Sequence, residues 1–178
     1  MTKRDEFIWK TLNVICWIIF IGYLLQAGTL IFNYIFSVFK PIAAEKLYLQ
    51  LDLSDVYEKS MGSYMALFTM AIFLSIFKAY LFYLAIKMFM KLNFVKPFSE
   101  EVSDYITKIS YHTFGIGLLG LIAHNYTKGL IKKGFEVSVI EQFWDSSETY
   151  ILMSAIIYVI ALIFKKGIEI QQEQDLTV

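Results

Sequence analysis

Hydrophobic residues fill four long stretches of the chain, and charged residues are confined to the segments between and around them. Residues 11–36, 109–127 and 149–164 contain no Asp, Glu, Lys or Arg, and residues 61–86 contain only Lys78. A helix needs roughly 20 apolar residues to cross the hydrocarbon core of a bilayer, with a usual range near 17–25. The pattern therefore predicts four transmembrane helices.

The predicted fold class is an all-α integral membrane protein, a four-helix transmembrane bundle in a single domain over residues 1–178. The first apolar run is much longer than the roughly 7–15 residues of a signal-peptide core, so we expect a true span there. The last run is short, but Lys165 and Lys166 can snorkel at one end and Trp144 can anchor the other. The spans are placed at about residues 11–36, 63–88, 105–127 and 149–166.

The two segments that join spans on the outer side, residues 37–62 and 125–148, contain alternating apolar and polar positions. Leucines stand at every second position from 47 to 53, and Phe135, Val137 and Val139 repeat the spacing. A period of two is typical of a half-buried strand, although a lone strand is only marginally stable. We therefore predict that the two strands pair as a small extracytoplasmic cap. Coil or helix lying on the membrane is the alternative.

The basic residues favour an orientation with both termini in the cytoplasm. On that assignment nine Lys and Arg residues lie near the inner ends of the spans and six near the outer ends. Cytoplasmic loops carry an excess of Lys and Arg, so the bias predicts a multi-pass protein of the cytoplasmic membrane. Residues 167–178 then form a cytoplasmic tail.

Composition excludes several classes of function. Charged residues make up 18% of the chain, against about 25% in soluble domains, and the formal net charge is zero, which does not suit direct binding of nucleic acid. The sequence contains none of the common catalytic motifs, so we expect no enzyme and no cofactor. His112 and His124 would stand roughly 18 Å apart on one helix, too far to share a metal ion. The single cysteine, Cys16, excludes an intrachain disulfide.

Each span carries a row of small or polar residues at helical spacing, and the rows are expected to face one another inside the bundle. Lys78 stands out because a lysine within the membrane is costly and suggests a function. Two interpretations stay open: the lysine reaches backbone carbonyls and water, which is favoured, or it holds an anionic ligand or lipid headgroup. The candidate ligand-binding residues are Lys78, Ser75, Gln26, His112, Thr113 and Tyr158.

Two short segments on the predicted cytoplasmic side are distinctive. In the sequence KPFSEE, Pro97 ends the preceding helix, Ser99 can cap the next one, and two glutamates favour its N-terminal dipole. The chain closes with FKKGIEIQQEQDLTV, in which a polar, mixed-charge tail ends on apolar residues. Such a tail is either a solvated helix end or a docking peptide. The candidate docking residues are Gly167, Glu169, Glu173, Asp175, Leu176 and Val178.

The combination of four spans, KPFSEE and the closing segment resembles a family of bacterial membrane proteins known as domain of unknown function number 2975. Members of that family are often encoded beside a small helix-turn-helix regulator. The resemblance therefore implies a cytoplasmic transcriptional regulator as a partner, at the bacterial inner membrane.

The expected function is that of a non-enzymatic regulatory or scaffolding membrane protein whose cytoplasmic loop and tail dock a soluble partner. The alternative is a protein that binds or transports a small solute or lipid through the polar interior around Lys78. No inverted repeat or broken helix of the kind that marks transporter sites is evident in the sequence. Self-association is left open.

Overall fold

The computed structural model describes residues 3–40, 47–92 and 98–176, and nearly all of them are helical. Four long helices form the body of the molecule, and each is long and apolar enough to cross a membrane. A short helix and two 3₁₀ turns lie in the connections between them. The long helices are α1 (Lys3–Phe39), α3 (Met61–Lys91), α4 (Glu100–Lys132) and α5 (Ser147–Leu176), and the short elements are η2 (Tyr48–Gln50), α2 (Ser54–Lys59) and η3 (Ser138–Phe143).

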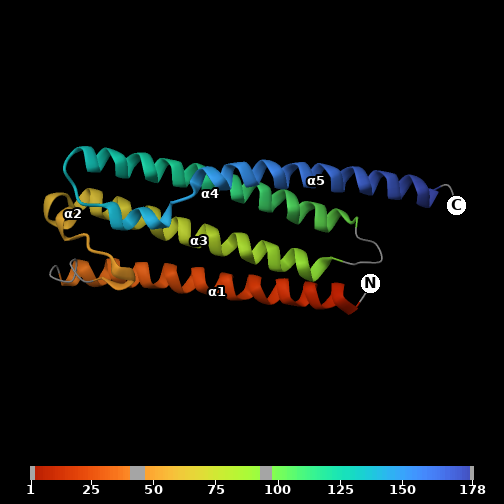
Figure 1. Ribbon diagram of the computed structural model, residues 1–178, viewed down its shortest axis with the longest axis horizontal. Coiled ribbons are helices and arrows are strands. Elements are labelled where there is room, and N and C mark those ends of the chain that lie inside the picture. Colours follow the sequence, from red (N-terminus) through yellow and green to blue (C-terminus); the bar gives the residue numbers. More distant parts are fainter. Residues whose placement is uncertain (1–2, 41–46, 93–97, 177–178) are drawn as a thin grey trace.

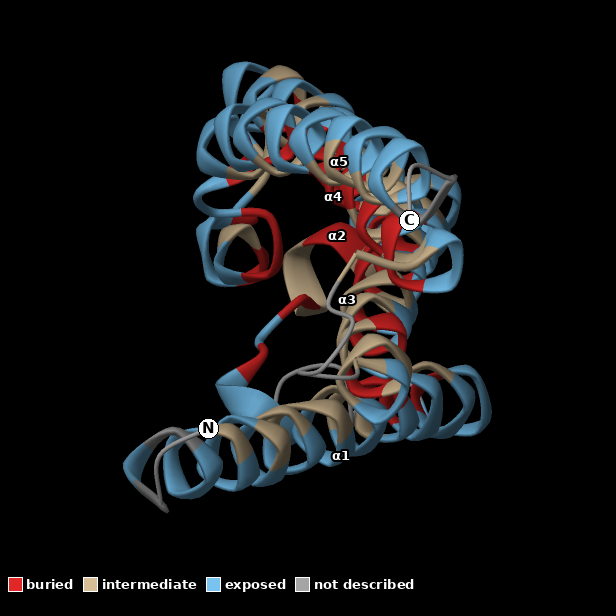
Figure 2. Cartoon of the chain, turned by 90° about the vertical axis from the view of Figure 1, so that its right-hand side faces the viewer, coloured by how far each residue is buried: buried red, intermediate tan, exposed pale blue. Residues whose placement is uncertain are grey.

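The long helices pack in the order in which they occur along the chain. The extensive contacts join α1 to α3, α3 to α4, and α4 to α5. Viewed along the helices, α1 and the α4–α5 pair lie on opposite sides of α3, which gives the molecule an open, C-shaped cross-section (Figure 2). Both described chain ends lie at one end of the molecule, here called the terminal end, and α2 lies at the other, the loop end (Figure 1).

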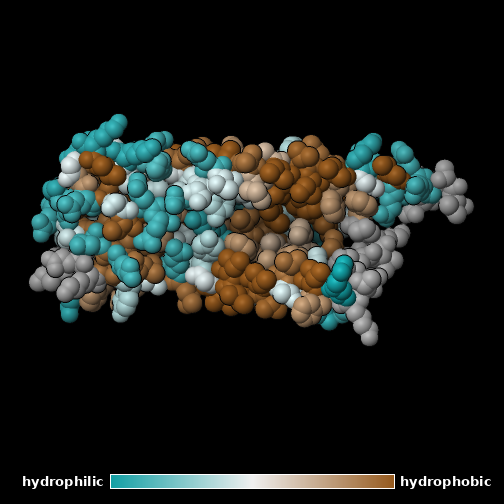
Figure 3. Space-filling view, viewed as in Figure 1, coloured by the Kyte–Doolittle hydropathy of each residue, from teal (hydrophilic) through white to brown (hydrophobic). Residues whose placement is uncertain are grey.

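Hydrophobic residues form a band between two hydrophilic ends. On the face shown in Figure 3 the band lies toward the terminal half of the molecule, and the loop end is largely hydrophilic. The long helices extend beyond the predicted spans, α1 and α5 mainly at the terminal end and α4 at both of its ends. A β-carbon at Gly120 would lie 2.9 Å from Cβ of Ser147, the first residue of α5, so residues 121–132 of α4 extend beyond the start of α5.

The largest hydrophobic core lies toward the loop end, where side chains from α1, the connecting segments, α3 and α4 meet. Tyr64 and Phe68 of α3 are completely buried in it, and the Tyr64 hydroxyl donates a 2.6 Å hydrogen bond to Oγ of Ser37 in α1. A smaller cluster around Val102 and Ala161 joins α4 to α5 nearer the terminal end. The loop end is thus held together by a hydrophobic core to which several segments contribute.

Small residues bring α4 and α5 close together. A β-carbon at Gly117 would lie 2.6 Å from Cγ1 of Ile151 and 2.9 Å from the carbonyl oxygen of Ser147. The Ser110 hydroxyl donates a 2.9 Å hydrogen bond across the same interface to the carbonyl of Ser154. Helices in lipid associate through such small residues and hydroxyl bonds. Gly117 and Gly120, two of the small residues in the third span, therefore face the start of α5.

The predicted two-strand cap is wrong for the described residues, which form no strand. Leu47 and Leu51 are buried as alternation would require, but they belong to one tight turn closed by the 3.1 Å hydrogen bond from N of Leu47 to O of Leu51. Leu49, at the tip of the turn, adopts a left-handed conformation with φ 67° and faces outward. A turn of this length reproduces the in-out pattern of a strand.

The second predicted strand fails for a different reason. Val137, Ile140 and Phe143 are all buried, so the apolar positions recur every third residue from Val137 onward. A 3₁₀ helix has three residues per turn, and η3 uses that period to bury one face against α3 and α4. Of the alternating residues Phe135, Val137 and Val139, only Val137 is buried and belongs to the period of three, and Val139 is exposed.

The structure confirms the prediction that Ser99 is the N-cap residue of α4. Oγ of Ser99 accepts a hydrogen bond from the backbone N–H of Val102 at 3.3 Å. Glu100 and Glu101 occupy the first turn, where negative charge is favourable. α3 ends at Lys91, and Nζ of Lys91 pairs with Oε1 of Glu101 at 2.8 Å. Pro97 lies outside the described residues.

Candidate functional site

The ammonium group of Lys78 lies where four segments of the chain converge. Its Nζ donates a 2.8 Å hydrogen bond to the carbonyl oxygen of Phe143. The same nitrogen stands 5.8 Å from the ring centroid of Tyr23 and 5.6 Å from that of Tyr150. Both distances fall within the roughly 6 Å over which a cation is attracted to an aromatic face.

Each contact comes from a different element. Lys78 lies in α3, Tyr23 in α1, and Tyr150 in the first turns of α5. Phe143 is the last residue of η3, whose final carbonyls have no helical partner, so the lysine satisfies one of them. We therefore define the Lys78 site as Lys78, Tyr23, Tyr150 and the carbonyl of Phe143.

The charge at this site has no acidic partner in the described part of the chain, because no described carboxylate forms an ion pair with Lys78. Lys78 is partly buried. An ammonium group has three N–H donors, and the Phe143 carbonyl engages one of them. The Lys78 site is therefore positively charged, and its ammonium group has remaining capacity for a hydrogen-bond acceptor.

A cavity of about 340 Å³ lies between α3, α4 and α5, and it adjoins the Lys78 site through Tyr150, which lines it. Polar groups of Ser146, Thr149 and Tyr150 lie at its loop-end side. Thr113 and apolar side chains line the remainder, and the apolar ones include Leu81, Phe82, Ala85, Met153 and Ile157. The polarity of the walls thus changes along the cavity.

The structure places the other predicted ligand-binding residues in several environments. The hydroxyl groups of Ser75 and Thr113 bond to carbonyls of their own helices, at 2.8 Å to Ala71 and 2.7 Å to Ile109, and Thr113 also lines the cavity. Gln26 is half-buried in α1.

The remaining two candidates contact other aromatic rings. His112 packs edge-on against Tyr80, with ring centroids 4.6 Å apart. Tyr158 lies 6.1 Å from Tyr111 and is 40% exposed. The contacts that join Lys78 to other segments come instead from Tyr23, Tyr150 and Phe143. Sequence reasoning placed neither Tyr23 nor Tyr150 in the candidate site, because no motif links residues so far apart.

At the terminal end, α5 continues as one helix through the polar tail to Leu176. Gly167 permits this course beside the start of α4, because a β-carbon there would lie 2.5 Å from the ring of Phe98. The same ring packs edge-on against Phe164 at 5.2 Å. Gly167 therefore has a packing role: it allows the part of α5 beyond Lys166, here called the tail helix, to pack against Phe98.

The tail helix exposes most of its side chains. Glu169 is exposed, and its Oε2 forms an ion pair with Nζ of Lys166 at 2.6 Å. The neighbouring side chain of Ile170 is 48% exposed. Glu173 is exposed as well. Asp175 and Leu176 lie at the described end of α5, and Val178 lies outside the described residues.

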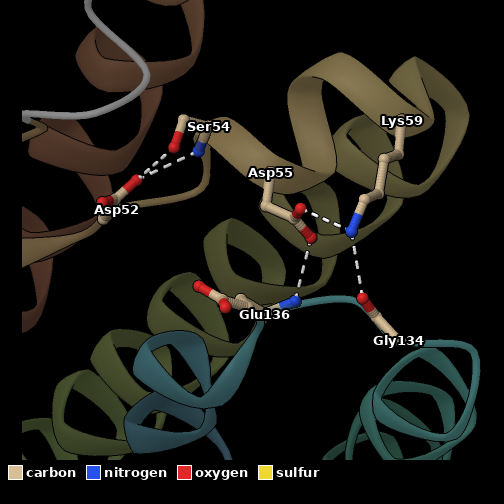
Figure 4. Close-up of polar contacts among 6 residues, drawn as sticks. All are labelled: Asp52, Ser54, Asp55, Lys59, Gly134 and Glu136. Atoms are coloured by element: carbon tan, nitrogen blue, oxygen red, sulfur yellow. Dashed lines mark hydrogen bonds and ion pairs between the residues drawn. The ribbon is translucent and has the colours of Figure 1, made fainter.

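Polar contacts tie the two loop-end segments together (Figure 4). Nζ of Lys59 lies 2.6 Å from Oδ1 of Asp55 and donates a 3.0 Å hydrogen bond to the carbonyl of Gly134. Oδ2 of Asp55 accepts a 3.0 Å hydrogen bond from the backbone N–H of Glu136. The bond from Lys59 and then that from Glu136 lower the pKa of Asp55 below its ordinary value. The loops meet through side chains rather than through paired strands.

The structure gives no sign of a metal centre: within the described ranges, no group of three or more His, Cys, Asp or Glu side chains is placed to hold a metal ion.

Comparison with known proteins identifies a family and nothing closer. The model of a family described as "Protein of unknown function (DUF2975)" matches residues 42–178. No curated protein matches the chain, and no solved structure does.

Proposed function

The chain belongs to the DUF2975 family, whose function is unknown, and from that premise we propose that it holds a soluble regulatory protein at the cytoplasmic face of a bacterial inner membrane. The terminal end is the cytoplasmic face in this proposal, as the distribution of Lys and Arg favours. The docking element in this proposal is the tail helix, the part of α5 beyond Lys166.

The observation that carries the proposal is the continuity of α5. A frayed tail would lose conformational entropy on binding a partner, whereas a helix that is already formed loses less. The Phe98–Gly167 contact holds the tail helix in a defined direction from the membrane. Ile170, exposed among polar neighbours, is a suitable apolar anchor for a partner.

The charge of the tail helix favours a basic partner. Residues 167–178 contain Glu169, Glu173 and Asp175 and no Lys or Arg. Electrostatic complementarity speeds association and selects partners. A small DNA-binding regulator has a basic face of the required sign, so binding to the tail helix would compete with binding to DNA.

A pull-down from native membranes tests the proposal. The full chain is compared with a chain truncated after Lys166, and captured proteins are identified by mass spectrometry. We expect a DNA-binding protein that is retained by the full chain and lost on truncation, because truncation removes the whole tail helix.

Two point variants make the test specific. Ile170→Asn removes the apolar anchor, and Glu148→Gln, an exposed change at the loop end, is the matched control. Capture should fall with Ile170→Asn and stay unchanged with Glu148→Gln. Equal capture by the full and truncated chains would refute the proposal.

A further inference from the structure

We infer that the Lys78 site binds the headgroup of an anionic phospholipid, with one acyl chain of that lipid in the adjoining cavity between α3, α4 and α5. This binding site is separate from the tail helix and lies in the half of the bilayer nearer the loop end.

The level of Lys78 along the bundle supports a headgroup. Its contacts are with Phe143, which precedes α5, and with Tyr150, in the first turns of α5. The uncharged part of α5 runs from Thr149 to Phe164. Lys78 therefore lies level with the loop-end limit of the shortest apolar helix, roughly 22 Å from Lys165 at about 1.5 Å per residue. Measured along α5, the lysine is therefore deep from the terminal end and level with the loop-end limit of the uncharged run.

The chemistry of the site favours a negative charge. The ammonium group has no described acidic partner, and the Phe143 carbonyl engages only one of its donors. The rings of Tyr23 and Tyr150 flank it, and tyrosine is enriched at the headgroup level of membrane proteins. A phosphate oxygen would satisfy the remaining N–H groups in a charge-assisted hydrogen bond.

The cavity accommodates the acyl chain of the lipid. It starts at Ser146, Thr149 and Tyr150 and continues past Phe82 to Ile157, so its walls become apolar away from the lysine. Its volume of about 340 Å³ lies within the roughly 300–1,000 Å³ of pockets that hold small ligands. A soluble anion would leave the apolar walls unused, whereas a phospholipid matches both the charge and the polarity gradient.

The Lys78 site lies between α1 and α5, which share no extensive interface. α1 and the α4–α5 pair lie on opposite sides of α3, and α1 and α5 are not among the closely packed helix pairs (Figure 2). Lys78 contacts Tyr23 of α1 on one side and Tyr150 of α5 on the other, so a bound headgroup would lie where α1 and α5 approach each other.

Native mass spectrometry of the purified full chain in detergent tests the inference, with phosphatidylglycerol as the anionic lipid and phosphatidylcholine as the zwitterionic one. Phosphatidylglycerol should bind more tightly. Lys78→Met should weaken it by roughly fivefold, the effect of one basic residue near anionic lipid, and should leave phosphatidylcholine unchanged. Lys78→Arg should retain binding. The matched control is Lys87→Met, which removes a lysine on the same helix, 5.5 Å from the ring of Tyr83 and nearer the terminal end.

A second pair of variants keeps the inference testable if Lys78→Met does not fold. Ala85→Phe fills the cavity without removing the lysine, and Ala155→Phe places the same ring on an exposed face of α5. Only Ala85→Phe should weaken phosphatidylglycerol. The inference is overturned by equal binding of the two lipids, by equal losses in the two Lys→Met variants, or by equal binding in the two Ala→Phe variants. Displacement of the lipid by inorganic phosphate alone would point to a soluble anion and overturn it as well.

Discussion

Gly117 is the position at which a single methyl group would meet the backbone of a neighbouring helix. A β-carbon there would lie 2.9 Å from the carbonyl oxygen of Ser147 and 3.0 Å from the backbone nitrogen of Ile151. Backbone atoms cannot move aside without shifting α5. Gly115, two residues earlier on the same helix, has nothing within 4 Å of its would-be β-carbon. The two glycines therefore form a natural pair for comparison.

We predict that Gly117→Ala lowers the stability of the protein by about 1–3 kcal/mol, the usual cost of overpacking. Gly115→Ala should be neutral or stabilising by up to about 1 kcal/mol, because alanine favours the helix. Thermal unfolding in detergent measures both. An unchanged melting temperature for Gly117→Ala would show that α5 does not pack on α4 at this distance.

Asp55 gives the loop end a defined pH dependence. Its bonds to Lys59 and to the N–H of Glu136 lower its pKa in the folded protein below the ordinary value of 3.8. A group whose pKa is lowered by folding stabilises the folded state above its ordinary pKa. That stabilisation is lost as the pH falls through the lowered pKa, where the carboxylate takes up a proton.

The stability difference between the natural protein and Asp55→Asn should therefore be constant at neutral pH and shrink toward zero as the pH falls below about 4. Thermal unfolding of both proteins across that range measures the difference. Asp52→Asn is the control, because Asp52 bonds only to the nearby Ser54 in Figure 4. A difference that grows on acidification would contradict the assigned contacts.

At the scale of elements, the start of α4 depends on one hydroxyl group. Oγ of Ser99 accepts from the N–H of Val102, which otherwise has no helical partner. We expect Ser99→Ala to cost about 1 kcal/mol and Ser99→Asp to retain the cap. Thermal unfolding distinguishes the two variants. Unchanged stability of Ser99→Ala would mean that the cap contributes nothing.

The elements that sequence reasoning predicted well are those defined by long uncharged runs, such as residues 109–127, because crossing a membrane requires such length. The connecting segments were mispredicted as strands. Leu47 and Leu51 are buried by a turn whose shape depends on the left-handed Leu49, and Val137 begins a 3₁₀ helix. A window of a few residues does not distinguish these structures from a strand.

The candidate site shows the same limit. A lysine within an apolar run is visible in the sequence, and Lys78 was singled out for that reason. Its partners Tyr23, Phe143 and Tyr150 are separated from it by 55, 65 and 72 residues. Aromatic residues are common in this chain, at 17%, so only the packing of helices identifies which of them meet the lysine.

At the scale of the whole molecule, the described chain ends share one end, and α2 lies at the other (Figure 1). We predict that the terminal end is cytoplasmic. In a Cys16→Ser background, Glu58→Cys should react with a membrane-impermeant maleimide in intact spheroplasts. Gln172→Cys should react only after permeabilisation, since both side chains are exposed but on opposite ends of the molecule. The reverse labelling pattern would show that the terminal end faces away from the cytoplasm.

The sequential packing of the long helices also bears on how the protein is made. A ribosome delivers α1, α3, α4 and α5 in that order, and each helix packs mainly on the one inserted just before it. Local contacts of this kind form quickly and leave few unpaired surfaces during synthesis. The Lys78 site is the exception, because Phe143 and Tyr150 emerge only after α4 is complete. The Lys78 site therefore forms only when α5 has packed against the helices made before it.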